Sequence, residues 1–497
     1  MLLNQLSIQK LFAKFDLFYV FLLLLFVVFV VFPTNNHLTD SYDYAASVKY
    51  GVKLFAPHHL LYNAVCYVFV RIFSPFVADL DVIRTMQYIN AVFAILSGFV
   101  FRKILILNSN KKSTANAWTL FALCSFGFMR FATEAETFII PIYFSLIATW
   151  YFLKFLTENT NRYALYSGIF ASIACLFHQI HLFWGIGLFV GFMLAKQYKS
   201  GLYYLMFTPT VLIVYVLVVY FYNDTELSVT TFFNFIAYYY HSDNADTSFT
   251  INNLIITGIT FVRTFFQVHG LVAVLFDKYL WLALLVSAAT LVLLAFSISH
   301  FIKKFRFTRL FKSNVFAQTV AIVFVLQLVF AVFSHGNSEF MVMFPFLLAL
   351  FLPSIIEIGK SSIWYFTGAM FVWNMSFGLI PNKCIDFQNN GELIHFIHRH
   401  PTAYFVVKEY HLLTSMYFYE FGVDVYDKLL PIDHDFKSNK LLTSSTIYTD
   451  VLTKKTAMGR LEFTKDFDTS GFVFKQHHTY IHTFMGGFYV DEITLKK

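Results

Sequence analysis

The chain has few charged residues for its size, and this shortage is its most informative property. Only 13% of its 497 residues are Asp, Glu, Lys or Arg, whereas 58% are hydrophobic and 65 are Phe. Soluble globular domains carry about 25% charged residues, so the composition excludes an ordinary soluble protein. Several apolar runs reach the ~20 residues that a helix needs to cross hydrocarbon. We therefore expect a mostly α-helical, multi-pass membrane protein.

Cysteine is also scarce, and the few present show no pairing pattern. Of four Cys, Cys66, Cys124 and Cys175 lie in apolar stretches, so the sequence supports neither a disulfide framework nor a zinc cluster. It also lacks a Gly-rich phosphate loop, a Walker motif and a DNA-binding signature. These absences argue against a nucleotide or nucleic-acid partner.

Eleven apolar segments are candidates for membrane-spanning helices. The first, 17–32, follows Lys10 and Lys14 and lacks the small-residue cleavage site of a signal peptide, so we expect a retained helix with a cytoplasmic N-terminus. The other segments are 86–101, 115–131, 138–156, 163–177, 182–194, 202–222, 279–302, 315–333, 340–356 and 363–380.

Basic residues decide how two ambiguous apolar stretches are placed. Segments 59–77 and 251–276 each carry one arginine and interrupting polar residues. If both lie along the outer interface, as amphipathic segments can, the basic loops at 102–112, 196–199 and 303–312 fall on the cytoplasmic side, as the positive-inside rule requires. If 59–77 spans, the basic loop at 102–112 moves outside; if 251–276 spans as well, only the loops after it, such as 303–312, return to the cytoplasmic side. We therefore expect about eleven spans, with both stretches interfacial.

With this orientation, acidic and histidine side chains gather at the outer membrane boundary, whereas the cytoplasmic loops are mostly short and basic. Ionisable groups there are costly unless they are solvated, paired or used, so the asymmetry favours a reaction centre that faces outward. For any single residue, a wet polar loop is the simpler alternative. The residues are Asp40, Asp43, His58, His59, Glu134, Glu136, His178, His181, Asp224, Glu226, His335 and Glu339.

Hydropathy falls after residue 380, and we expect residues 381–497 to form a soluble α/β domain. Segments 391–400 and 410–421 have helical patterns, and 403–407 and 423–426 have strand patterns. An odd number of spans places this domain outside the cytoplasm, in a periplasm-like space. Its histidines lack metal-ligand spacing, so a cap over the active site or a partner-binding module is the expected role.

Five short motifs fall on the expected outer side. In chain order they read Asp40-Ser41-Tyr42-Asp43, Pro57-His58-His59-Leu60-Leu61-Tyr62, Thr133-Glu134-Ala135-Glu136-Thr137-Phe138, His178-Gln179-Ile180-His181-Leu182, and His335-Gly336-Asn337-Ser338-Glu339-Phe340 followed by Phe344-Pro345. This series resembles the motifs of the GT-C superfamily of membrane glycosyltransferases, especially the bacterial relatives of protein O-mannosyltransferases. The chain departs from them at Asp43, where relatives often carry Glu, and at His58-His59, which replace part of a Pro run.

The resemblance runs through most of residues 1–360 and implies a GT-C-like catalytic module at 1–380, with a first outer loop at 33–85 and a second at 223–278. It implies a hexosyl- or pentosyltransferase that moves a sugar from a polyprenyl-phosphate donor to an acceptor at the outer face, with inversion at the sugar carbon. The acceptor is a glycan, a lipid or a protein. The low Cys count and the lack of organelle signals favour a bacterial inner membrane.

Transfer from a lipid-linked phosphosugar needs a base for the acceptor hydroxyl and groups that stabilise the departing phosphate. Asp40 is the candidate base and Asp43 the second candidate, whereas an N-cap of the following helix is the alternative role of Asp40. Glu136 would hold the acceptor or a divalent cation such as Mg²⁺ or Mn²⁺, unless it only begins a helix. We expect no other cofactor.

Other residues are candidates for binding substrate. His178 and His181 are three residues apart and would share a helical face, where they would donate to the phosphate or only tie helices together; no third metal ligand stands at a fixed spacing. Arg263 would give the phosphate a positive partner, unless it is a snorkelling interfacial arginine. The motifs add His58, His59, Glu134, His335 and Glu339 to this set.

Two other functions fit the composition. One is a transporter or flippase of a lipid-linked or small polar substrate; such proteins usually place ionisable groups near the midplane and often show internal repeats, and the sequence shows neither. The other is a glycan polymerase or ligase with a different fold. A transporter predicts a central cavity with polar lining from both leaflets, whereas an enzyme predicts loss of product on Asp40→Asn.

Overall fold

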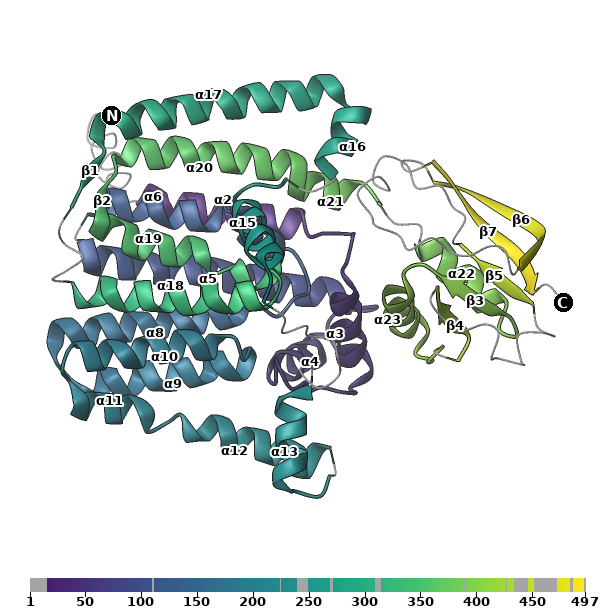
Figure 1. The fold of residues 1–497 in the computed structure, drawn as a ribbon, viewed down its shortest axis with the longest axis horizontal. Coiled ribbons are helices and arrows are strands. Elements are labelled where there is room, and N and C mark those ends of the chain that lie inside the picture. The colour runs from purple at the N-terminus through teal and green to yellow at the C-terminus, as the bar shows by residue number, and fades with distance from the viewer. Residues whose placement is uncertain are drawn as a thin grey trace, which may run out of the picture.

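Long apolar helices lie side by side in a bundle that makes up most of the molecule (Figure 1). The computed structural model describes residues 16–109, 111–223, 225–238, 249–268, 271–308, 314–387, 390–425, 427–432, 446–450, 472–482 and 486–495. Lys10, Lys14, Asp224, and parts of the predicted second outer loop and C-terminal domain lie outside these residues.

The first half of the bundle contains α2 (Leu17–Val31), α3 (Thr39–Tyr50), α4 (Tyr62–Phe73), α5 (Val82–Ser109), α6 (Lys112–Leu123), α7 (Phe126–Ala132), α8 (Ile139–Glu158), α9 (Asn161–Phe177), α10 (His181–Leu194), α11 (Tyr198–Leu205), α12 (Pro209–Leu217) and η1 (Val218–Tyr222). The second half contains α13 (Val229–Ile236), α15 (Ile251–Phe265), α16 (Leu271–Lys278), α17 (Leu280–Lys304), α18 (Val315–Phe333), η3 (Ser338–Met341), α19 (Phe344–Ile355), α20 (Lys360–Asn374), η4 (Met375–Leu379) and α21 (Ile380–Cys384). The two-residue strands β1 (Arg306–Phe307) and β2 (Ile356–Glu357) pair at one end.

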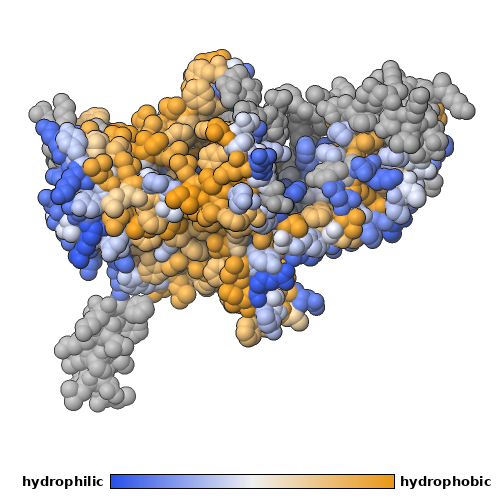
Figure 2. Space-filling view, turned by 90° about the horizontal axis from the view of Figure 1, so that it is seen from below, coloured by the Kyte–Doolittle hydropathy of each residue, from blue (hydrophilic) through white to orange (hydrophobic). Residues whose placement is uncertain are grey.

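Helix length and composition identify an integral membrane protein. In the described part of the chain, seven helical segments are long and apolar enough to cross a membrane: Val82–Asn108, Ile139–Glu158, Tyr198–Tyr222, Leu280–Lys304, Val315–Phe333, Ser338–Ile355 and Lys360–Cys384. Leu17–Val31, Tyr62–Phe73 and His181–Leu194 are shorter apolar helices. Figure 2 shows a hydrophobic band over the bundle, with hydrophilic surface at either end. The number of eleven spans stays a prediction.

Two predicted helices are broken. Segment 115–131 contains α6 and α7, which separate at Cys124 because its backbone carbonyl accepts a hydrogen bond from Asn374 Nδ2 at 3.0 Å instead of continuing the helix. Segment 202–222 also contains two α-helices, and α12 begins at Pro209. Proline has no N–H to continue a helical ladder, so it is well suited to a first turn.

Helices α4 and α15 lie across the direction of the bundle. Both are seen end-on in Figure 1, where the spanning helices are drawn lengthwise. Helix α4 has 12 residues and α15 has 15, which corresponds to lengths of about 18 and 22 Å, against about 30 Å of hydrocarbon. On α15, Thr257 and Thr264 are buried while Ile259 is exposed. This geometry favours the interfacial placement of 59–77 and 251–276.

After α21 the described residues form two helices and a five-stranded mixed sheet. The elements are α22 (Asn390–Arg399), β3 (Tyr404–Val407), α23 (Tyr410–Phe421), β4 (Leu429–Pro431), β5 (Ile447–Thr449), β6 (Phe472–His482) and β7 (Gly486–Leu495), with strand order β4-β3-β5-β7-β6. Strand β3 is parallel to β4 and β5, whereas β7 is antiparallel to β5 and β6.

The predicted helices 391–400 and 410–421 and the strand 403–407 are confirmed to within a residue. The predicted strand 423–426 is wrong in its described residues, 423–425. The carbonyl of Val425 accepts from the N–H groups of Lys428 and Leu429 in a turn, so it is not available to a strand ladder. The strand that pairs with β3 is β4, a few residues later.

The C-terminal elements dock on the bundle through α23 and α3. Lys49 Nζ and the Tyr50 hydroxyl both donate to the carbonyl of Tyr419, at 2.8 and 3.0 Å. Ser415 Oγ donates to Asp43 Oδ1 at 3.1 Å. The sheet therefore lies at the end of the bundle that also carries α3 and α4 (Figure 1).

Candidate functional site

A cavity of about 1330 Å³ lies between α3, the turn after α9, and the loop before η3. Its polar part is lined by Asp40, Tyr44, His58, His178, Gln179, Ser334, His335, Asn337 and Glu339. Its apolar part runs between α9, α10, α12 and α18. There Ile186, Leu212 and Val329 are 41%, 56% and 48% exposed, so the cavity reaches the apolar side of the bundle.

Asp40 lies in the first turn of α3 and is exposed to the cavity. The predicted alternative that Asp40 caps this helix is wrong, because Leu38 is the N-cap residue and makes no side-chain cap. Desolvation by the surrounding protein raises the pKa of the Asp40 carboxyl, and the charge of Asp43 raises it further. A base is most effective when its pKa approaches the working pH, so this shift suits proton abstraction.

Asp43 faces another direction. It does not line the cavity, and its carboxylate accepts the hydrogen bond from Ser415 of α23. The two acids of the first motif therefore have different surroundings: Asp40 lines the cavity, and Asp43 contacts the C-terminal elements.

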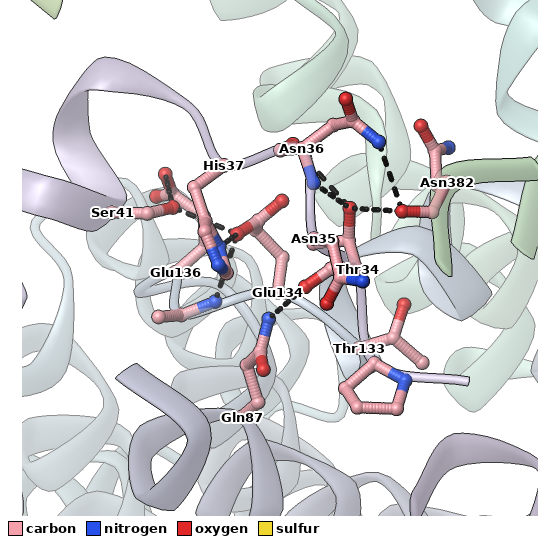
Figure 3. Close-up of polar contacts among 12 residues, drawn as sticks. Thr34, Asn35, Asn36, His37, Ser41, Gln87, Thr133, Glu134, Glu136 and Asn382 are labelled. Carbon is pink, nitrogen blue, oxygen red and sulfur yellow. Dashed lines mark hydrogen bonds and ion pairs between the residues drawn. The ribbon is translucent and has the colours of Figure 1, made fainter. Parts of the chain in front are cut away.

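The second acidic motif forms the turn between α7 and α8. Its two glutamates contact Ser41, the residue that follows Asp40 in the chain. Glu134 and Glu136 are 2% and 1% exposed, and Ser41 Oγ lies 3.0 Å from Glu134 Oε1 and 3.1 Å from Glu136 Oε1 (Figure 3). His37 Nδ1 lies 3.0 Å from the same Glu134 oxygen. Asn90 Nδ2 donates to the backbone carbonyls of both glutamates, at 2.8 and 2.7 Å.

The histidines of the second and fourth motifs divide into two groups. His58 and His178 line the cavity with ring centroids 5.9 Å apart, and their loops are joined because the Gln179 N–H donates to the His58 carbonyl at 2.9 Å. Burial lowers the pKa of His58 to about 4, so its imidazole is neutral at pH 7. His59 is fully buried against the Tyr44 ring, 4.4 Å between centroids, and does not line the cavity.

The prediction that His178 and His181 share a helical face is wrong. His178 ends α9 in an extended conformation, φ −161° and ψ 125°, and His181 is the first residue of α10. His178 lines the cavity, whereas His181 does not, and its Nδ1 lies 2.7 Å from Ser145 Oγ inside the bundle.

The last motif brings His335 and Glu339 to the cavity. Gly336 has φ +66°, and a Cβ there would lie 2.6 Å from the backbone nitrogen of Thr257 on α15, so glycine is needed at this crossing. Asn337 begins η3: its Oδ1 accepts from the Glu339 N–H at 3.1 Å, and its Nδ2 donates to Glu339 Oε2 at 3.2 Å. These bonds orient Glu339.

Arg263 does not line the cavity. It is half-buried on α15, and burial, followed by the charge of Arg130 on α7, lowers the pKa of its guanidinium. None of the described residues that line the cavity is Lys or Arg. The predicted positive partner of a phosphate is therefore not placed there.

Of the predicted site residues, the structure brings Asp40, His58, His178, His335 and Glu339 to one cavity, whereas Asp43, His59, Glu134, Glu136, His181 and Arg263 lie outside its lining. Sequence reasoning missed His37 and Asn90. Asn90 could have been found, since an amide within an apolar span is costly unless it is used. No group of three or more His, Cys, Asp or Glu among the described residues is arranged to hold a metal ion.

No protein-family model matches the chain, and no curated protein matches it in sequence. Among solved structures, it is similar to the oligosaccharyltransferase of Archaeoglobus fulgidus, crystallised with Zn and sulfate, at 10% identity over 94% of this chain and 72% of that chain, with a TM-score of 0.46. It is also similar to ArnT from Cupriavidus metallidurans bound to undecaprenyl phosphate, at 11% identity over 96% and 97% of the two chains, with a TM-score of 0.43. At TM-scores below 0.5, this likeness assigns neither a fold nor a function.

Proposed function

We propose that the protein is a GT-C-like membrane glycosyltransferase, which moves a sugar from a polyprenyl-phosphate donor to an acceptor. One observation carries the proposal: Asp40 is exposed at the polar end of a cavity whose other end reaches the apolar side of the bundle. A donor with a polar head and an isoprenoid tail matches this division. The cavity also exceeds the ~300–1,000 Å³ of most small-molecule pockets.

Asp40 would act as the base. It would take the proton of an acceptor hydroxyl while the hydroxyl oxygen bonds to the anomeric carbon of the sugar. The bond from that carbon to the phosphate oxygen would break, its electron pair would stay on the phosphate, and the carbon would invert. The raised pKa of Asp40 makes its carboxylate a stronger base than an ordinary aspartate.

Imidazole N–H groups would donate hydrogen bonds to the departing phosphate. His58, His178 and His335 line the polar part of the cavity, and an imidazole ring has at least one N–H donor when it is neutral or protonated. Preorganised donors that face a developing charge are the usual means of stabilising it.

We place the catalytic module at 1–380 and a soluble α/β domain at 381–497, on the extracytoplasmic side of a bacterial inner membrane, with the N-terminus in the cytoplasm. The sheet and α23 lie at the end of the bundle that carries Asp40, as a cap over an outward-facing site would. The transporter alternative predicts polar lining from both leaflets, whereas the carboxyl and imidazole groups that line this cavity belong to α3, η3 and the loops near them.

The proposal is tested by blocking the apolar part of the cavity. Val329 and Val325 are both on α18 and similarly exposed, 48% and 54%, but only Val329 lines the cavity. Transfer of label from a panel of radiolabelled polyprenyl-phosphate sugars to an envelope extract is measured in vesicles. Val329→Trp should abolish transfer and Val325→Trp should retain it. Equal transfer by both variants would refute this donor site.

A further inference from the structure

The Ser41 hydroxyl lies between two buried carboxyl groups (Figure 3). Its oxygen is within 3.1 Å of one oxygen from each glutamate, Glu134 and Glu136. A hydroxyl has one hydrogen, and an ionised carboxylate has none to give. If both glutamates were ionised, one of the two contacts would join lone pairs only. A proton on one carboxyl group gives each of the two contacts a hydrogen of its own.

The donors around Glu134 make it the ionised partner. Its Oε1 lies 3.0 Å from His37 Nδ1 and also accepts from the backbone N–H of Ala135 at 3.3 Å. The amide can only donate. Hydrogen bonds to an ionised acceptor are stronger than those between neutral groups, so this collection of donors stabilises a carboxylate at Glu134.

Glu136 has the opposite surroundings. Its Oε1 contacts Ser41, and its Oε2 is buried with no hydrogen-bond partner among the described residues. An ionised oxygen in that position would carry the full cost of desolvation. The titratable groups that face Glu136 are Asp40 of α3, Tyr62 of α4, Glu134 of the same turn and Glu339 of η3, and His37 lies beyond Glu134.

We propose that Glu136 is held as a neutral carboxylic acid, which donates from Oε1 to Ser41 Oγ, while Ser41 donates to the Glu134 carboxylate. The chain of hydrogen bonds then runs in one direction and leaves no contact without a hydrogen. Burial, and then the charges of Asp40, Glu339 and Glu134, raise the pKa of Glu136 well above its usual range. Glu136 is thus a positioning residue.

The consequence for transfer depends on the proposed function, whereas the protonation does not. Ser41 follows Asp40 in the first turn of α3, so the hydrogen bond from Glu136 helps to fix that turn. A neutral Glu136 also removes one negative charge from beside Asp40, where an anionic phosphate must approach. A protonated carboxyl at this place therefore favours both orientation of the base and entry of the donor.

Infrared spectroscopy tests the protonation without any substrate. The full-length protein is measured at pH 7 in a maltoside detergent, which has no ester carbonyl to overlap the C=O band of a protonated carboxyl. The spectrum of Glu136→Gln is subtracted from that of the wild type, in H₂O and in D₂O. The matched control is Glu158→Gln, because Glu158 is exposed and pairs with Lys154 at 3.6 Å.

A carboxylic-acid C=O band that shifts in D₂O should be present in the wild type and absent from Glu136→Gln, and the control should keep it. Loss of a carboxylate band instead would show that Glu136 is ionised and would overturn the proposal. Ser41→Ala removes the acceptor of the proposed hydrogen bond, so it should move the band to higher frequency; an unchanged band would also contradict the geometry. A protein without transferase activity could still show the band, so the two proposals fail separately.

Discussion

Replacing Glu136 by Gln should change how the stability of the protein depends on pH. The folded state raises the pKa of Glu136, whereas an unfolded chain has a Glu pKa of about 4.3. Between these two values the unfolded state releases a proton that the folded state keeps. The unfolded state then binds fewer protons, so the free energy of unfolding falls as pH rises. Glutamine does not titrate, and its amide can still donate to Ser41.

The linkage relation gives the size of this effect. One proton contributes a slope of about 1.4 kcal/mol per pH unit. From pH 5 to pH 6, the wild type should therefore lose about 1.4 kcal/mol relative to Glu136→Gln. Well below the unfolded pKa of about 4.3, where both states of the wild type are protonated, the difference between the two proteins should stop changing.

The assay is an SDS titration in maltoside micelles, followed by tryptophan fluorescence at pH 5.0, 5.5 and 6.0. Glu158→Gln is the control, because this exposed glutamate should give no comparable slope. If the difference between wild type and Glu136→Gln is constant over this range, Glu136 titrates as an ordinary carboxylate, and the reasoning from the Ser41 hydrogen is refuted.

Three further predictions follow from the site and its supports. The acid limb of kcat/KM should have an apparent pKa above the ~3.9 of an ordinary aspartate, because Asp40 must be ionised to act and its pKa is raised; a limb at or below that value would exclude it. Ser415→Ala should weaken docking of α23 by about 1 kcal/mol and speed limited proteolysis of the C-terminal elements, whereas unchanged cleavage would make the Asp43 contact unimportant. Gly336→Ala should lower the melting temperature and turnover together, because its Cβ would meet Thr257 at φ +66°; wild-type stability would contradict the close crossing.

The sequence predicted the bundle, because long apolar runs have few alternatives in a membrane. It also predicted α22, α23 and β3. It failed at the α6–α7 break, which depends on Asn374, a residue 250 positions away in the chain. Long-range hydrogen bonds of this kind leave no local pattern.

The candidate site was predictable in part. The motif order located Asp40, His58, His178, His335 and Glu339, which do line one cavity. Spacing could not show that Asp43 turns toward Ser415, because the partner lies on α23. It also misjudged His178 and His181, since a helix boundary between them changes their directions.

The most direct test of Asp40 as the base compares the wild type with Asp40→Asn in lipid vesicles, at equal folded yield, with Glu158→Gln as the control. Each protein receives radiolabelled polyprenyl-phosphate sugars and a crude envelope acceptor, and label that leaves the lipid is counted. A general base contributes roughly 10²–10⁴-fold, so Asp40→Asn should lower transfer by about that factor while the control keeps it. Equal transfer by Asp40→Asn and wild type would contradict the account.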